Sequence, residues 1–172
     1  MLKANKINHK LLDPGIYCVS NCRGIITIDI RLSKPNISAQ RVFGRPLHSL
    51  EHLLAWYFKV LSPHSDEVIS ICPGACGTMF YLELYEGFTM RIEDEVKNAL
   101  LFAVRAKGVP FSSEVECGSC RFHKLQRAKR FAEESYKRLF VTYAVTDEVL
   151  HDRIYSKTKP RTIIQKFIDL WR

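Results

Sequence analysis

The segment LHSLEHLLAWYF contains a His-x-x-Glu-His pattern formed by His48, Glu51 and His52. If this segment is helical, the two histidines share one face and the glutamate lies beside them. Two imidazoles at this spacing can bind one divalent metal, and a neighbouring carboxylate can move protons at whatever the metal binds. The order matches the inverzincin peptidases. The alternative interpretation is an ordinary helix with two surface histidines. It stands unless another part of the chain supplies a third metal ligand.

Cysteine chemistry is the second candidate activity. The N-terminal segment lacks the apolar core of a signal peptide, so we interpret the cysteines as thiols, and we expect a cytoplasmic protein. The six cysteines lie at positions 18, 22, 72, 76, 117 and 120. Cys76 is flanked by small residues in the segment Gly-Ala-Cys-Gly-Thr, which predicts an approachable, reactive sulfur. A small buried residue is the alternative, and Cys72, within a predicted strand, fits that alternative better.

Cys117 is the candidate third metal ligand, with Cys120 and His123 close by in the sequence. A thiolate beside two imidazoles would leave one coordination position open, as in catalytic rather than structural metal sites. A structural four-cysteine zinc site is the alternative. It would use the cysteines at positions 72, 76, 117 and 120.

Hydrophobic periodicity predicts strands at 16–22, 25–32, 67–73 and 78–85, and helices at 47–61, from about 90, and at 123–140. The segment Asn21–Gly24 predicts a hairpin, Thr89 a helix cap, and Leu61 the last buried residue of the first helix. No regular βαβ alternation occurs. We therefore predict an α+β fold in a single domain, with an antiparallel sheet packed against helices. The catalytic domain would cover 1–145, and 146–172 would form a helical extension packed on it.

Composition excludes some classes of protein. The chain has 172 residues, 47% of them apolar, which suits a folded domain with its own core. No apolar run is long enough to cross a membrane, so we expect no membrane partner. The net charge of +8 suggests nucleic acid. However, the densest basic cluster shares a predicted helix with Glu133 and Glu134, which favours a solvated helix face, so we do not expect a nucleic-acid partner.

Four sequence blocks, in the correct order, resemble the S-ribosylhomocysteine lyase (LuxS, autoinducer-2 production protein) family. The family pattern Phe-Asp-Ile/Leu-Arg-Phe-x-x-Pro-Asn corresponds to 28–36, and His-Thr-Leu-Glu-His-Leu corresponds to 48–53. The pattern Ile-Ser-Pro-Met-Gly-Cys-x-Thr-Gly-Phe/Tyr-Tyr corresponds to 71–81, and Cys-Gly-x-x-x-x-His-x-Leu to 117–125. An Asp-His pair of the family has a counterpart in Asn8-His9. The resemblance extends from about residue 7 to about residue 140.

The resemblance implies an α+β sandwich that forms a homodimer with active sites at the subunit interface. It also implies one divalent metal per subunit, natively Fe²⁺ and often Zn²⁺ in isolated protein. The implied metal ligands are His48, His52 and Cys117. The implied general acid/base pair is Cys76 and Glu51, and the implied substrate-binding residues are His9 and Arg31.

The implied substrate is S-ribosylhomocysteine, a ribose joined by a thioether to homocysteine. A metal would polarise its open-chain carbonyl and acidify the adjacent C–H, and a thiolate and a carboxylate would then move protons as the carbonyl migrates. β-Elimination would release homocysteine and 4,5-dihydroxy-2,3-pentanedione, the precursor of autoinducer-2. The resemblance therefore implies a carbon–sulfur lyase of the activated methyl cycle that serves quorum sensing.

This chain also departs from the family pattern. The departures include Ala4, Lys59, Ser70, Gly77 and Met79, and the run Lys-Leu-Gln-Arg at 124–127, where the family has Ser-Leu-Glu-Gly. All implied metal ligands and the acid/base pair are present, so the departures concern the pocket wall more than the chemistry. Two alternatives stay open at this point. One is an inverzincin peptidase with Glu114 or Glu116 as third ligand, and the other is a non-enzymatic module that binds metal or nucleic acid. Taken singly, His9, Asp29 and Arg31 would be ordinary surface residues.

Overall fold

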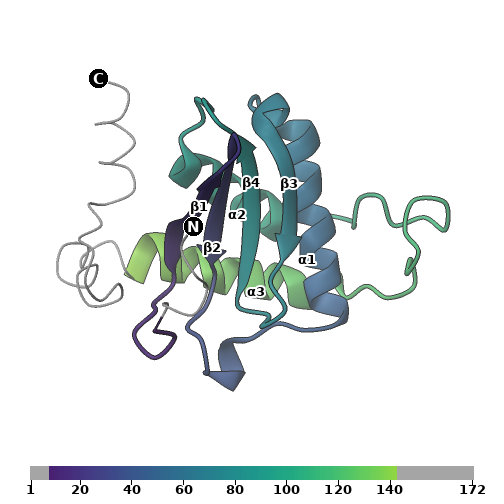
Figure 1. Ribbon diagram of the computed structural model, residues 1–172. Coiled ribbons are helices and arrows are strands. Elements are labelled where there is room, and N and C mark those ends of the chain that lie inside the picture. Colours follow the sequence, from purple (N-terminus) through teal and green to yellow (C-terminus); the bar gives the residue numbers. More distant parts are fainter. Residues whose placement is uncertain (1–7, 143–172) are drawn as a thin grey trace.

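The computed structural model describes residues 8–142, which form a four-stranded antiparallel sheet with helices on one face (Figure 1). The strands are β1 (Gly15–Cys22), β2 (Ile25–Arg31), β3 (Val68–Pro73) and β4 (Met79–Tyr85). The α-helices are α1 (Arg45–Trp56), α2 (Ile92–Arg105) and α3 (Leu125–Lys137). This arrangement confirms the predicted α+β fold. Within residues 8–142, no helix is long and apolar enough to span a membrane.

The strands are ordered β1-β2-β4-β3, and each neighbouring pair is antiparallel. The predicted hairpin joins β1 to β2. Its turn contains Arg23 with φ 54° and Gly24 with φ 77°. Two consecutive residues with positive φ match the twist of the flanking strands, which explains why the chain can reverse here with a glycine in second place.

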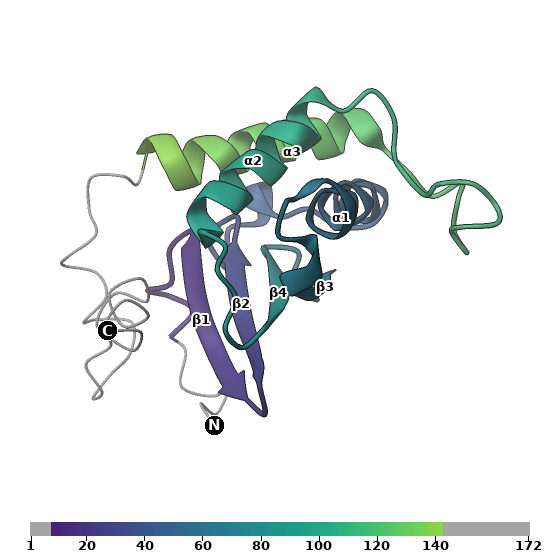
Figure 2. The same cartoon turned by 90° about the horizontal axis from the view of Figure 1, so that it is seen from above.

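The two layers pack through one face of the sheet. On β2, Ile26, Ile28 and Ile30 alternate with polar residues and are buried against the helical layer. Leu82 and Leu84 of β4 are fully buried beside them. Figure 2 shows that α1, α2 and α3 all lie on this side of the sheet. The described helices leave the opposite face uncovered, and the polar residues of β2 point to that face.

Helix α1 begins at Arg45, two residues before the predicted start, and Pro46 lies in its first turn, where the missing N–H of proline costs no hydrogen bond. The predicted burial of Leu61 is wrong, since this side chain is 47% exposed. A π-helical turn, Tyr57–Leu61, follows α1 and widens the helix. The extra residue in that turn rotates Leu61 away from the apolar face, and Phe58 is buried instead.

The predicted capping role of Thr89 is also wrong. Helix α2 begins after Arg91, which occupies the cap position without a side-chain hydrogen bond. The hydroxyl and the amide N–H of Thr89 instead donate to Glu67, which also accepts the amide N–H of Met90. Glu67 therefore joins the start of β3 to the segment before α2.

Helix α3 continues into a π-helical turn, Arg138–Thr142. Its basic residues are partly matched by acidic ones four positions away, as in the pairs Lys137–Glu133 and Arg138–Glu134. The predicted extension at 146–172 lies outside the described residues.

Gly77 closes the turn between β3 and β4, and its replacement tests this turn. Its φ is +65°, and an added Cβ would lie 2.3 Å from the carbonyl oxygen of Val42. Because that obstacle is backbone, we expect Gly77→Ala to lower the free energy of unfolding by about 2 kcal/mol or more in urea titrations. Gly108→Ala is the matched control, since an added Cβ there meets nothing within 4 Å. Equal stability of both variants would contradict this account.

Candidate active site

Two separate elements bring one group of metal-ligating side chains together. Helix α1 presents His48 and His52 one turn apart. The connection between α2 and α3, residues 106–124, supplies Cys117 and His123. Their ligand atoms all lie within 4.8 Å of one another. The connection extends beyond α1, away from the sheet, in both Figure 1 and Figure 2. The metal cluster, defined as these four residues, thus lies at the outer side of the helical layer.

Backbone carbonyls orient the two helical imidazoles. Nδ1 of His48 donates to the carbonyl oxygen of Phe122 at 2.9 Å, and Nδ1 of His52 donates to that of Pro110 at 2.8 Å. A carbonyl oxygen only accepts, so each Nδ1 carries the proton and each Nε2 keeps a lone pair. The two Nε2 atoms are 3.1 Å apart. One divalent ion could bind both nitrogens at this separation.

The sulfur of Cys117 completes the set that the sequence predicts. This residue is buried, and its Sγ lies 3.5 Å from Nε2 of His48. The amide N–H of Ser119 donates to the same sulfur at 3.4 Å. Imidazole and thiolate ligands suit Zn²⁺ and Fe²⁺ rather than Mg²⁺ or Ca²⁺. The donor atoms present therefore fit a divalent transition metal.

His123 is the residue that the sequence analysis missed as a member of this cluster. Its ring stacks on that of His48, with ring centroids 4.3 Å apart and planes 17° from parallel. Burial, together with the neighbouring imidazoles of His48 and His52, lowers the pKa of His123. A lowered pKa keeps the ring neutral, which is the form that binds metals. Its position six residues after Cys117 was the available signal.

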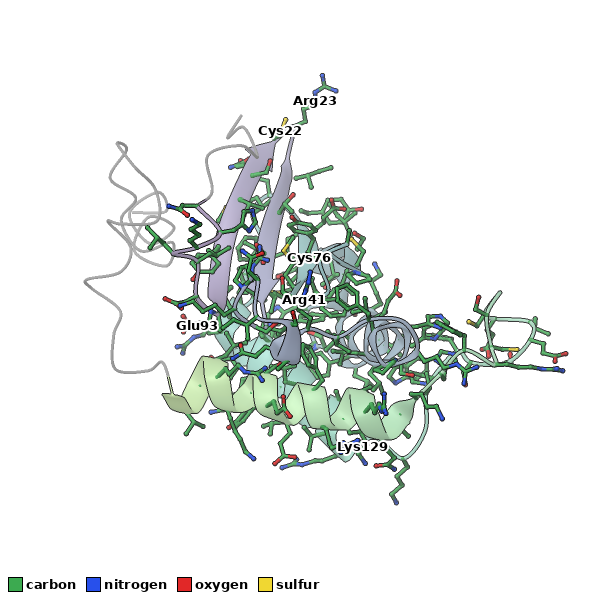
Figure 3. All side chains as sticks on the ribbon, turned by 90° about the horizontal axis from the view of Figure 1, so that it is seen from below. Cys22, Arg23, Arg41, Cys76, Glu93 and Lys129 are labelled. Atoms are coloured by element: carbon green, nitrogen blue, oxygen red, sulfur yellow. The ribbon has the colours of Figure 1, made fainter. Side chains whose placement is uncertain are left out.

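A second group surrounds Cys76 on the sheet side of the molecule. Arg31 Nη1 donates to the hydroxyl oxygen of Thr78 at 2.9 Å and lies 3.7 Å from the sulfur of Cys76. The hydroxyl of Thr78 is 2.8 Å from that sulfur. Arg41 reaches the carbonyl oxygen of Cys76, and Figure 3 shows these two residues side by side, far from the hairpin turn at Arg23. Hydrogen-bond donors therefore hold this sulfur in place.

The expectation that Asp29 and Arg31 are ordinary surface residues is wrong. They are 2% and 1% exposed, and they form an ion pair with each other. Asp29 Oδ1 and Arg31 Nε are buried with no hydrogen-bond partner among the described residues. Burial raises the pKa of Asp29 to about 6, against the opposing effect of the Arg31 charge. The alternation of β2 indicated their shared face but gave no sign of this burial.

Two predicted site residues remain outside both groups. Glu51 is half-buried on α1. Its charge acts on Cys72 of β3, where burial, the charge of Glu83 and the charge of Glu51 together raise the pKa of the thiol. His9 lies exposed in the turn before β1. Within residues 8–142, no hydrogen bond links the metal cluster to Cys76, Glu51 or His9.

The geometry also bears on the alternative metal sites. Among the described residues, the metal cluster is the only group of three or more candidate ligands. It includes neither Cys72 nor Cys76, so the four-cysteine alternative is wrong. Neither Glu114 nor Glu116 belongs to it, so the third ligand expected of an inverzincin is missing.

Comparison with known proteins agrees with the geometry. The family described as S-Ribosylhomocysteinase (LuxS) matches residues 2–144 of this chain. The chain belongs to the LuxS family. Relatives named S-ribosylhomocysteine lyase match shorter segments. The protein from Exiguobacterium sibiricum is 32% identical over 111 residues, covering 64% of this chain and 69% of the relative. That from Staphylococcus saprophyticus is 38% identical over 110 residues, covering 61% and 65%. That from Oceanobacillus iheyensis is 38% identical over 111 residues, covering 62% and 67%.

One departure from the LuxS pattern has a structural explanation. The family pattern around Cys76 has methionine where this chain has Gly74 and glycine where it has Met79. The Met79 side chain is buried, and its Cγ lies 2.8 Å from where a Cβ on Gly74 would be. The side chain of Met79, the first residue of β4, thus occupies the space beside residue 74.

Two further departures have local partners in this chain. Ser70 stands where LuxS proteins commonly have an acidic residue, and its hydroxyl donates to Glu83 on the adjacent strand at 2.8 Å. A carboxylate is therefore retained next to this position. Lys59, where an arginine is frequent, donates to the carbonyl oxygen of Val68 at the start of β3. Ala4 lies outside the described residues.

The raised pKa of Asp29 makes a testable contribution to stability. Its pKa is 3.8 in an unfolded chain and about 6 in the folded protein, so the fold binds the proton more tightly. This stabilisation is fully present below about pH 4 and is lost as the pH rises through 6. We expect urea titrations to give a free energy of unfolding that falls by about 2 kcal/mol more between pH 4 and 6 in wild type than in Asp29→Asn.

The exposed Asp66 provides the control for this measurement. Asp66→Asn should keep the wild-type dependence on pH. If Asp29→Asn also keeps it, the proton on Asp29 does not contribute to stability, and the burial argument is wrong.

Proposed function

We propose that this protein is an S-ribosylhomocysteine lyase, which cleaves the thioether of S-ribosylhomocysteine to give homocysteine and 4,5-dihydroxy-2,3-pentanedione. The observation that carries the proposal is the convergence of His48, His52 and Cys117 on one point in a member of the LuxS family. Family membership and the absence of glutamate from the cluster favour this activity over a peptidase.

A divalent metal held by His48, His52 and Cys117 would supply a Lewis acid that polarises the open-chain carbonyl of the sugar and acidifies the adjacent C–H. Cys76 would take the carbon-bound proton at its sulfur, which Thr78 and Arg31 hold in place. Glu51 would exchange protons with the substrate hydroxyls as the carbonyl migrates to C3. Loss of the homocysteine thiolate by β-elimination completes the reaction.

The remaining parts of the proposal concern substrate, metal and assembly. Arg31 and His9 would contact the substrate. The native metal would be Fe²⁺, with Zn²⁺ in isolated protein, because the donor set accommodates both. The pentanedione product is the precursor of autoinducer-2. The enzyme would therefore link quorum sensing to the recycling of homocysteine in the activated methyl cycle.

We further propose a homodimer with its active sites at the subunit interface. The described helices leave one sheet face uncovered (Figure 2), and buried polar atoms of Asp29 and Arg31 on that face have no partner among residues 8–142. Within the same residues, no hydrogen bond joins the Cys76 group to the metal cluster. A second subunit on this face could complete the site.

Release of thiol from S-ribosylhomocysteine tests the activity. Fe²⁺-loaded protein prepared without oxygen should release one thiol per substrate cleaved. Cys76→Ala and Glu51→Gln should lower kcat about 10²-fold to 10⁴-fold while keeping their bound metal, because proton transfer is lost but the ligands remain. Cys22→Ala removes an exposed cysteine at the far end of the sheet and should retain full activity (Figure 3). If the metal-loaded wild-type protein releases no thiol, the proposed lyase activity is wrong.

Sedimentation equilibrium tests the assembly. The full chain should sediment as a species of twice its 19.9 kDa mass. Its specific activity should fall on dilution as dimers dissociate, because each active site needs both subunits. A monomer with undiminished activity at every concentration would exclude a site at the interface.

A further inference from the structure

The proposed function uses three protein ligands, but a fourth side chain points its ring nitrogen into the same space. Nε2 of His123 lies 3.9 Å from the sulfur of Cys117. Its ring packs edge-on against that of His52, with centroids 4.9 Å apart. The four ligand atoms lie within 4.8 Å of one another. In a tetrahedral site with bonds of about 2.0–2.3 Å they would be roughly 3.3–3.8 Å apart, so the side chains need to move closer by about 1 Å when an ion binds.

The contacts of Ser49 indicate which nitrogen of His123 faces the metal cluster. The hydroxyl of this buried serine donates its one proton to the carbonyl oxygen of Arg45 at 3.0 Å. It also accepts the amide N–H of Lys124 at 2.8 Å. The same oxygen lies 3.3 Å from Nδ1 of His123. Because Nδ1 faces this hydroxyl, Nε2 is the ring nitrogen on the side of the cluster.

All three imidazoles of the cluster therefore have the same arrangement. Each has Nδ1 within hydrogen-bond distance of an oxygen and Nε2 on the side of the cluster, which is how ligating histidines are usually oriented.

We propose that Nε2 of His123 is a fourth protein ligand, which closes the resting metal site as a three-histidine, one-cysteine set, and that it leaves when a substrate oxygen takes its place. The anchoring of the ligands favours His123 as the one that leaves. His48 and His52 lie on a helix and have contacts of 2.9 and 2.8 Å to carbonyl oxygens. His123 lies in a loop and has a contact of 3.3 Å to a hydroxyl. This inference rests on the metal site of the proposed function but adds a ligand to it.

Cobalt substitution tests the inference without measuring activity. The full-length protein is loaded with Co²⁺ under nitrogen, and its visible absorption and its affinity for Co²⁺ are measured, the affinity by competition with a chelator. His123→Gly should bind Co²⁺ at least about 10-fold more weakly and show altered ligand-field bands. Added imidazole should restore the wild-type bands in this variant and should not change the wild-type spectrum.

Further variants make each outcome decisive. His123→Gln preserves more side-chain volume and should show the same loss if His123→Gly does not fold. His64→Gln is the matched control, because this histidine lies outside the cluster and pairs with Glu67, and it should keep the wild-type spectrum and affinity. His52→Gln should abolish tight binding.

The pattern of results separates this inference from the proposed function. If both His123 variants keep the wild-type bands and affinity while His52→Gln loses binding, His123 is not a ligand. The proposed lyase activity would be unaffected by that result. Unchanged binding in His52→Gln would mean that the metal lies elsewhere, and both proposals would fail.

Discussion

The convergence of nitrogen lone pairs on one point is the constraint on which this site depends. Carbonyl oxygens of the 106–124 connection accept the Nδ1 protons of His48 and His52, so both Nε2 atoms face inward at 3.1 Å. This arrangement places both ring nitrogens where one divalent ion can bind them. Because the carbonyls belong to a segment distant in sequence, the helix and the connection must dock correctly before the site exists.

Much of the fold and part of the site could be predicted from local sequence. The alternation of β2 and the spacing of apolar residues on α1 determine which faces are buried, and these signals need only neighbouring residues. The spacing of His48 and His52 on a helix is equally local. Cys117 was predicted as the third metal ligand because a thiolate commonly completes a site with two imidazoles. The structure places its sulfur beside His48.

The rest depends on contacts that no local pattern encodes. The burial of Asp29 and Arg31 depends on how neighbouring segments cover the sheet face, and their mutual pairing allows it. Leu61 is exposed because a π-helical turn breaks the periodicity that predicted its burial. The position of His123 depends on Ser49, 74 residues away in sequence, whose hydroxyl faces Nδ1 of its ring. Each case is a tertiary contact that overrides a local preference.

The division of the ligands between α1 and the 106–124 connection has a consequence for folding. A metal bound to His52 and Cys117 joins two points far apart in the chain, as a disulfide does, in a protein whose described cysteines are all free. Unlike a disulfide, this cross-link is reversible and follows mass action, so its stabilisation grows with the free metal concentration relative to the dissociation constant. The entropic cost of ordering the connection is therefore offset by an ion that the surroundings supply.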